Sequence, residues 1–295
     1  MRVDDVAVSF KRYALHERGM RPLSHRSIMA TMTMLCDWAD TDQLSQLDQG
    51  TVREFLYWGK EERAWEARTF RNHRQYLKSF FGFCVKRQYL KRNPVDGIDK
   101  PKLPHRLPRC LTKEATQTIL SQVRWYPWRY QSEAVRNETI LYVFVYTGLR
   151  LQELLDLELM DISLEAREIM VRQGKGQKDR VVPIHPRLAS VLRRYVAQLR
   201  SRGHSSPYLF TGVQSMKPLS GKDVRIICQK LSHASGCYFT PHMLRHTFGR
   251  LAVEAGMDIF KIKEIMGHSS IATTQGYLSV STENLKLSML DLHLL

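Results

Sequence analysis

Residues 169–184 read IMVRQGKGQKDRVVPI, and this stretch carries the clearest β signal in the chain. Two short runs rich in β-branched residues, IMVRQ and RVVPI, flank the glycine-containing turn GKGQKD, a pattern typical of a β-hairpin. Lys175 and Lys178 give this hairpin a basic tip. The segments on either side show helical periodicity. We therefore expect a mainly α fold with a small β-sheet or hairpin.

Helices are expected both before and after the hairpin. Residues 133–147 include the run ILYVFVY, which is apolar all round and predicts a deeply buried helix. A threonine and a proline at positions 240 and 241 supply an N-cap and a first-turn proline for a helix that ends at Gly256. Another helix is expected from Asp258 to Gly267. The aromatic segment VRWYPWRYQ (123–131) is interpreted as a loop pinned to its own domain.

A basic, proline-rich segment, KPKLPHRLPR (100–109), interrupts the helical pattern. Proline removes backbone donors and fixes the backbone, so a run with three prolines is typical of a linker. The sequence predicts a helical N-terminal domain over residues 1–100, a linker over 101–109 and a second domain over 110–295.

The N-terminal part combines an apolar helical stripe with basic side chains. Phe70, Leu77 and Phe80 recur at helical spacing within residues 67–90 and predict a face that packs on a core. Basic residues fall largely off this stripe or follow it directly, and we interpret them as phosphate contacts. The candidate DNA-binding residues are Arg71, Arg74, Lys78, Lys86 and Arg87.

The charge balance points to a polyanionic partner. The 295 residues include 45 lysines and arginines but 29 aspartates and glutamates, which gives a formal net charge of +16. A surplus of this size favours nucleic acid, with an anionic membrane surface as the weaker alternative. The run ILYVFVY is far shorter than the ~20 apolar residues of a membrane span. We expect a cytoplasmic, nucleoid-associated protein with no membrane segment.

The five cysteines are scattered, and no CxxC pair is present in the sequence. This pattern indicates neither a disulfide framework nor a zinc site. Metal-ligand spacing and the phosphate-loop pattern GxxxxGK[ST] are also missing from the sequence. We therefore expect neither a metal nor another cofactor.

Four short patterns in the second part of the chain carry reactive side chains. They are TGLRLQEL (147–154), GKGQKDR (174–180), HMLRH (242–246) and GHSSIATTQGY (267–277). Each pattern alone is weak, since each also occurs as an ordinary turn or helix end. The candidates drawn from them are two guanidinium groups, one ammonium, two imidazoles and a phenol. This combination suits phosphoryl transfer on a diester.

Two arginines are the candidate clamp for the phosphate. The transition state concentrates negative charge on two non-bridging oxygens, and a guanidinium can donate two hydrogen bonds while it stays protonated. Arg150 and Arg245 are suited to this role. Glu153 is interpreted as a supporting residue that holds Arg150 or the hairpin in place.

The remaining side chains are candidates for the nucleophile, for the proton transfers and for a further phosphate contact. Tyr277 is the candidate nucleophile, and its phenol needs a base because its ordinary pKa is about 10. His242 is the candidate base. The leaving alkoxide needs a proton, for which Lys175 is the first candidate and Lys178 the second. His268 is placed to hydrogen-bond the phosphate.

At these positions the sequence resembles the tyrosine recombinase (phage integrase) family, most closely its compact Xer-like members. The matching motifs are Arg150-x-x-Glu153-Leu154, the hairpin lysine Lys175, His242-x-Leu244-Arg245-His246, Gly267-His268 and the nucleophile Tyr277, nine residues beyond His268. In the first part, the basic helix, the RNP at 92–94 and the linker resemble the family's core-binding domain. The resemblance spans nearly the whole chain.

The resemblance implies a two-domain, C-shaped clamp on duplex DNA, with a helical core-binding domain and a catalytic domain. It implies site-specific recombination or integration through a 3′-phosphotyrosine, without ATP or metal, by a homo-tetramer on two DNA sites. Leu285, Met289 and Leu292 recur at helical spacing in the tail, which suits docking into a neighbouring subunit; an intramolecular cap is the alternative. The alternative functions are a type IB topoisomerase and a non-catalytic DNA-binding protein.

Overall fold

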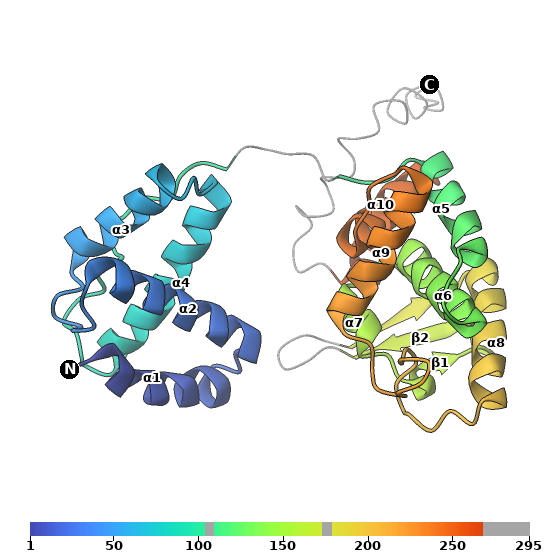
Figure 1. Ribbon diagram of the computed structural model, residues 1–295, viewed down its shortest axis with the longest axis horizontal. Coiled ribbons are helices and arrows are strands. Elements are labelled where there is room, and N and C mark those ends of the chain that lie inside the picture. Colours follow the sequence, from blue (N-terminus) through green and yellow to red (C-terminus); the bar gives the residue numbers. More distant parts are fainter. Residues whose placement is uncertain (104–108, 173–178, 268–295) are drawn as a thin grey trace, which may run out of the picture. The chain divides into compact units, whose positions relative to one another are not determined.

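The computed structural model describes residues 1–103, 109–172 and 179–267. The chain divides into two compact units, residues 1–105 and 106–295. The described residues are mostly helical, with one small antiparallel sheet in the second unit (Figure 1). This confirms the predicted mainly α fold with a small β element.

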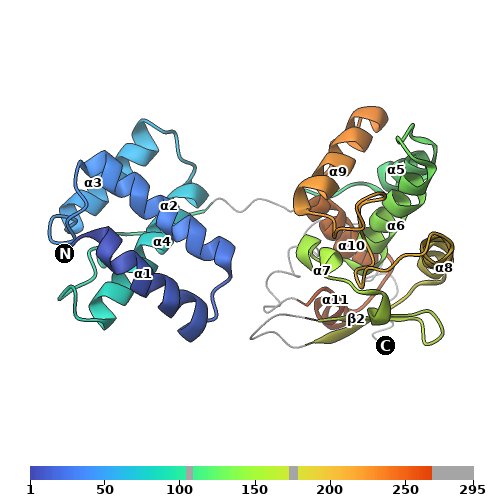
Figure 2. The ribbon, with the colours of Figure 1, turned by 60° about the horizontal axis from the view of Figure 1, so that its bottom comes forward.

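The first unit is built from helices. They are α1 (Val3–Arg12), which continues into a π-helical turn η1 (Tyr13–Glu17), α2 (Pro22–Ala39), α3 (Gln49–Glu61) and α4 (Ala67–Lys86). The N-cap Asp48 starts α3 by accepting a hydrogen bond from the Thr51 backbone N–H at 2.8 Å. Helix α4 packs against α1, α2 and α3 (Figures 1 and 2), so its apolar residues form the centre of this unit's core.

Helix α4 confirms the predicted apolar stripe and corrects one basic residue. Phe70, Leu77 and Phe80 are buried as expected. Arg74 was expected off this stripe, but its side chain is 6% exposed and its Nε donates to the Ile98 carbonyl at 2.6 Å. The interpretation of Arg74 as a DNA contact is therefore wrong. It lies one turn from Leu77 on the buried face and ties α4 to the segment that follows it.

The second unit surrounds one buried helix. Its elements are α5 (Lys113–Trp125), α6 (Gln131–Thr147), α7 (Leu151–Leu155), η2 (Leu159–Asp161), β1 (Ile162–Ser163), β2 (Glu168–Val171), β3 (Arg180–Pro183), α8 (Pro186–Ser201), α9 (Gly221–Ser235), α10 (Pro241–Glu254) and α11 (Ile259–Met266). Helix α6 packs against α5, α8 and α10 (Figure 1). Its ILYVFVY run is buried at Ile140, Leu141 and Phe144, as predicted.

The sheet has the order β1-β2-β3, and both pairings are antiparallel. Ile169 pairs with Val182, and both side chains are buried. Met170 pairs with Val181 on the opposite, exposed face. Helix α11 packs against β3 (Figure 2). The strands of the predicted hairpin are thus confirmed, while its tip, with Lys175 and Lys178, lies outside the described residues.

The aromatic segment 123–131 is fixed to its own unit as predicted, although its first three residues form the end of α5 and only 126–130 form the expected loop. Trp128 donates from Nε1 to the Val123 carbonyl at 2.8 Å, and its ring packs against Tyr126 at a centroid distance of 4.4 Å. Lys230 from α9 lies over the Trp128 ring. Trp125 stays exposed.

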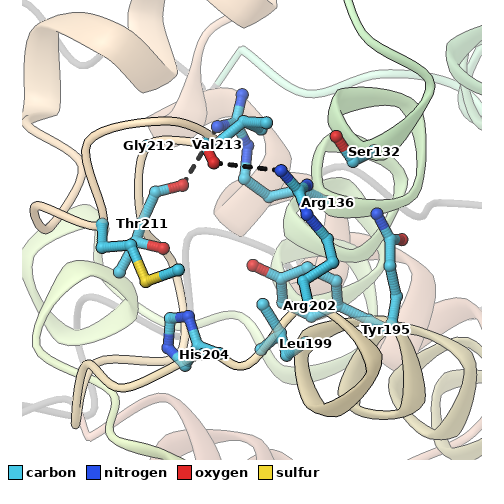
Figure 3. A pocket seen from close by; sticks show the side chains of 11 residues that line it. Ser132, Arg136, Tyr195, Leu199, Arg202, His204, Thr211, Gly212 and Val213 are labelled. Carbon is cyan, nitrogen blue, oxygen red and sulfur yellow. Dashed lines mark hydrogen bonds between the residues drawn. The ribbon is translucent and has the colours of Figure 1, made fainter.

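A small cavity lies where α6 and α8 meet the loop after α8 (Figure 3). It encloses about 20 Å³, the volume of roughly one water. Arg136 donates to the Thr211 carbonyl at 3.0 Å, and Arg202 donates to the Val213 carbonyl at 3.1 Å. The hydroxyl of Tyr195 donates to Leu209. These bonds fix the loop, which leads into α9.

In the described part of the chain, no helix combines the length and apolarity that a membrane span requires. Within the same residues, no group of three or more His, Cys, Asp or Glu side chains is placed to hold a metal ion. The cysteines are free thiols, and burial raises the pKa of Cys84 and Cys228 to about 12.

Candidate active site

Arg150 lies between the buried helix α6 and the short helix α7. Helix α6 ends at Gly148, whose φ of +61° is a backbone conformation that glycine adopts without strain. Arg150 then donates from Nη1 to Oε1 of Glu153 at 2.7 Å, and its backbone N–H donates to Oε2 at 2.8 Å. Its Nη2 donates to the Gly267 carbonyl at 2.5 Å. The turn therefore aims this guanidinium at the end of α11.

Arg245 reaches the same place from α10. The N-cap Thr240 accepts a hydrogen bond from the Met243 backbone N–H, and Pro241 occupies the first turn, as the sequence predicted. Arg245 is buried; its Nη1 donates to the Gly148 carbonyl at 2.5 Å and its Nη2 to the Met266 carbonyl at 2.8 Å. The two candidate clamp arginines therefore meet at one end of α11.

Glu153 supports this cluster from its centre. Its carboxylate accepts from Arg150 and Arg180 and lies 4.0 Å from Nη1 of Arg245. Burial alone would raise the pKa of Glu153, but the hydrogen bonds and charge of Arg180 and the hydrogen bonds of Arg150 hold it to about 2. The carboxylate is ionised at every working pH. It holds Arg150 and the start of β3, the two roles that the sequence left open.

Arg180 is a member of the cluster that sequence reasoning missed. It is the first residue of β3 and follows GKGQKD directly. Its side chain is 10% exposed and contacts Glu153 through both terminal nitrogens. The available signal was a charged residue at the start of an otherwise apolar strand, next to the predicted catalytic hairpin.

His242 projects from the first turn of α10, three residues before Arg245, and its side chain is exposed. Its Nε2 lies 3.0 Å from Nε2 of His246 one turn later. Burial, followed by the nearby charges of His242 and Arg245, lowers the pKa of His246 to about 4. His246 is therefore a neutral hydrogen-bond partner of the candidate base.

The structure thus places half of the six candidate catalytic residues: Arg150, His242 and Arg245. It brings the two arginines together around Glu153 and puts His242 on the same helix as Arg245. Lys175, His268 and Tyr277 lie outside the described residues.

The remaining basic residues of the first unit differ in their surroundings. Lys86 and Arg87 are exposed at the end of α4 and pair with Glu17 at 3.9 and 2.6 Å. Lys78 pairs with Asp96 at 2.7 Å. Arg71 is half-buried. These ion pairs are exposed and therefore weak, so each cation can exchange its carboxylate partner for a phosphate group.

The phage integrase family model matches residues 109–284, more than half of the chain. The chain belongs to the phage integrase family. Its similar relatives include the tyrosine recombinase XerA of Thermococcus kodakarensis, 35% identical over 80% of this chain and 84% of that protein. The tyrosine recombinase XerD of Rickettsia bellii is 27% identical over 92% and 93% of the two chains. This family member is a tyrosine-type site-specific DNA recombinase.

Solved structures share the fold of this integrase-family chain. One is the XerH site-specific recombinase bound to palindromic difH substrate in a post-cleavage complex, with a TM-score of 0.76 at 20% identity, covering 96% of this chain and 84% of that chain. Another is the Tn1549 transposon integrase in complex with transposon right end DNA, with a TM-score of 0.73 at 19% identity, covering 99% and 100%.

Proposed function

We propose that the protein cuts and rejoins duplex DNA at specific sites through a covalent 3′-phosphotyrosine at Tyr277. The observation that carries the proposal is the meeting of Arg150 and Arg245 around Glu153 at the end of α11. Two guanidinium groups at one point match the charge on the two non-bridging oxygens of a phosphodiester in its transition state.

Each proposed step assigns one bond or one proton. The Tyr277 oxygen attacks phosphorus, and the bond from phosphorus to the 5′ oxygen breaks. His242 takes the phenol proton and Lys175 gives a proton to the leaving 5′ oxygen. Arg150 and Arg245 neutralise the non-bridging oxygens, with His268 as a further donor. The 5′ hydroxyl of a second strand then reverses the step, and the phosphotyrosine link conserves the bond energy.

DNA binding is assigned to both parts of the chain. The formal charge of +16 supplies the general attraction to phosphate. Arg71, Lys78, Lys86 and Arg87 remain candidate contacts of the N-terminal domain. We assign residues 1–100 to this domain, 101–109 to the linker and 110–295 to the catalytic domain. In this proposal the two domains bind the duplex as a clamp, and the protein acts in the cytoplasm, at the nucleoid.

An apolar groove in the second unit supports assembly through the C-terminal tail. The groove has a volume of about 940 Å³, and its walls come from α5, α6, α10 and α11, with Leu120, Tyr146, Leu251 and Ile265 among the lining residues. The tail carries apolar residues at helical spacing and follows α11, which lines the groove. We assign the groove to the tail of a neighbouring subunit in a homo-tetramer on two DNA sites.

A pair of tail variants tests this assembly. Leu285→Glu should reduce the tetramer on DNA, measured by light scattering, whereas Asn284→Glu should leave it intact because Asn284 falls off the apolar stripe, about 100° around the helix from Leu285. An intramolecular cap would instead give a lower Tm for free Leu285→Glu protein with unchanged assembly.

Covalent capture tests the catalytic assignment and finds the DNA site. The protein is incubated with a library of nicked duplexes, denatured, and the DNA that stays attached is sequenced. We expect a defined set of ends joined to the wild-type chain and none joined to Tyr277→Phe. Arg150→Ala should slow attachment by about 10² to 10³. An adduct on Tyr277→Phe contradicts the nucleophile assignment.

The captured site also separates the alternatives. Strand exchange between two copies of the site identifies a recombinase, while relaxation of supercoiled plasmid without exchange identifies a topoisomerase-like activity. Binding without any adduct identifies a non-catalytic protein. The genomic position of the site then assigns the role among chromosome dimer resolution, plasmid maintenance, integration and transposition.

A further inference from the structure

Three arginines from three different elements end on three consecutive carbonyl groups at the end of α11. The donor and acceptor pairs are Arg180 Nε to Ile265 O (2.7 Å), Arg245 Nη2 to Met266 O (2.8 Å) and Arg150 Nη2 to Gly267 O (2.5 Å). The last carbonyls of a helix have no partner within the helix and carry partial negative charge. The end of α11 is thus a common anchor for all three side chains.

Arg180 also binds the Glu153 carboxylate, to which Arg150 donates. Its Nη1 donates to Oε1 of Glu153 at 3.1 Å, and its Nη2 donates to Oε2 at 2.7 Å. This two-point geometry fixes the orientation of the carboxylate as well as its position. With Nε bound to Ile265, all three nitrogens of Arg180 are engaged inside the protein.

The two arginines on Glu153 differ in their access to solvent. The side chain of Arg150 is 37% exposed, whereas that of Arg180 is 10% exposed. Arg150 can therefore approach a phosphate that enters the site, while Arg180 can affect that phosphate only through its neighbours.

We propose that Arg180 is a positioning residue for phosphoryl transfer: it fixes the Glu153 carboxylate so that Arg150 keeps free donors turned toward the scissile phosphate. The proposal rests on the proposed function. Without the Arg180 fork, Oε2 of Glu153 keeps the backbone N–H of Arg150 and lies 4.0 Å from Arg245. The carboxylate then turns to pair more fully with the clamp arginines, and their charge is drawn away from the phosphate.

The bonds of Glu153 explain why the loss of Arg180 would redirect its carboxylate toward the two clamp arginines. The Arg180 side-chain bond is the strongest of the influences that lower the pKa of Glu153 against the effect of burial. A buried carboxylate that loses a partner takes compensation from the nearest cations. In this cluster those cations are Arg150 and Arg245.

The test compares two substrates and three variants. Both substrates have the sequence of the nicked duplex captured with the wild-type protein. One carries an ordinary scissile phosphate, and the other carries a methylphosphonate at that position, which lacks the negative charge. Arg180→Gln removes the guanidinium, and Arg180→Lys keeps the charge but loses the fork. The control, Arg194→Gln, breaks an ion pair with Glu138 on α6, an acid that is 7% exposed and thus as buried as Glu153. Single-turnover adduct formation is measured at saturating protein, beside DNA affinity and Tm.

We expect Arg180→Gln to slow attack on the ordinary phosphate by about 10²-fold, because small displacements of a positioning group cost this much. DNA affinity should stay within about twofold. On the methylphosphonate, where charge neutralisation matters less, the deficit relative to wild type should shrink to less than about tenfold. Arg180→Lys should lie between, and Arg194→Gln should match wild type on both substrates.

Two results would overturn the proposal. One is Arg180→Gln attacking the ordinary phosphate at a wild-type rate; the other is an equal deficit on both substrates, which indicates a general structural role. If Arg180→Gln does not fold, the rate deficits of Arg180→Lys on the two substrates are compared instead. Equal deficits of Arg180→Lys on both substrates overturn the proposal in the same way. A wild-type protein that forms no adduct overturns the proposed function instead. If the wild type cleaves normally and Arg150→Ala is slow, the proposed function stands, and a wild-type rate for Arg180→Gln then counts against the role of Arg180 alone.

Discussion

The Nε2 atoms of His242 and His246 lie 3.0 Å apart on successive turns of α10. Two imidazoles can share this contact only if one ring nitrogen donates and the other accepts. Because the pKa of His246 is lowered to about 4, this ring is neutral near pH 7. The pair therefore fixes complementary tautomers, and His246 orients the ring of the candidate base, His242.

We expect His246→Ala to slow adduct formation by about tenfold, a part of the roughly 10² to 10⁴ that general acid–base catalysis contributes, because His242 stays present but loses its orienting partner. His246→Asn, which retains an amide donor, should restore part of the rate. The measurement is single-turnover cleavage from pH 5.5 to 9. If the cleavage rate falls by the same factor at every pH, and the acidic limb of the pH–rate profile does not shift, then His246 does not act on the proton transfer.

Folding stability should fall as the solution is acidified from about pH 6.5 to 4, partly because of His246. The unfolded chain takes up the proton near the ordinary pKa of 6.5, but the folded chain does so only near pH 4. Burial also lowers the pKa of His25 and His73, and these residues act in the same direction. Urea unfolding should therefore show a shallower pH dependence in this window for His246→Gln than for wild type. An identical slope would contradict the assignment.

Glu153 should act in a separate, more acidic window. Its pKa of about 2 lies below the ordinary 4.5, so its contribution is present above about pH 4.5 and is lost as the pH falls toward 2. Glu153→Ala leaves three clustered guanidiniums without their shared anion, and we expect a loss of about 3 to 5 kcal/mol in the unfolding of the second unit. Equilibrium denaturation at pH 7 checks this value. A loss below about 1 kcal/mol would show that the cluster is not anchored by its carboxylate.

Two glycines give a matched test of the turn before Arg150. Gly148 and Gly236 have nearly the same φ, +61° and +65°. A Cβ at Gly236 meets nothing within 4 Å, whereas a Cβ at Gly148 would lie 2.4 Å from the Phe248 ring. Gly236→Ala should cost about 1 to 2 kcal/mol, from backbone strain alone. Gly148→Ala should cost more and should also slow cleavage, because Arg245 donates to the Gly148 carbonyl. Equal effects of the two substitutions on Tm and cleavage would contradict this reading.

Helix α4 offers a prediction about DNA sequence preference. Arg68, Asn72 and Gln75 recur at helical spacing and are exposed, opposite the buried Phe70 and Leu77. Arg, Asn and Gln side chains can form paired hydrogen bonds with base edges. We expect Gln75→Ala to relax the preference at one base position at a cost of about 1 to 3 kcal/mol, without changing the salt slope, and Lys86→Ala to reduce the slope by about 1. Library capture at two salt concentrations measures both.

Local patterns predicted the parts of the fold that local chemistry determines. The buried ILYVFVY helix, the capped start of α10 and the strands beside GKGQKD follow from apolar period, cap residues and β-branching, each readable within a few residues. The pairing of Arg150 with Glu153 was likewise foreseeable, because the two residues are three positions apart on one turn.

Contacts that span distant parts of the chain were beyond these patterns. Arg74 lies on the apolar stripe by helical spacing, four residues after Phe70 and three before Leu77, but its partner, the carbonyl of Ile98, comes from outside α4 and has no local signal. Arg180 became part of the site because β3 packs against α11 and the Arg180 side chain reaches Glu153 on α7, contacts that a charged residue at the start of an apolar strand does not specify. The neutrality of His246 depends on burial, which one helix does not specify.

The shared carboxylate of Glu153 also constrains how this cluster can change during evolution. An arginine at position 180 is useful only beside an acid at 153, and a buried acid there is costly without that arginine. Among homologous chains, the two positions should therefore co-vary, with a neutral residue at 153 accompanied by the loss of arginine at 180. Variation at 180 should be narrower than at the exposed cations of α4, each of which can drift independently.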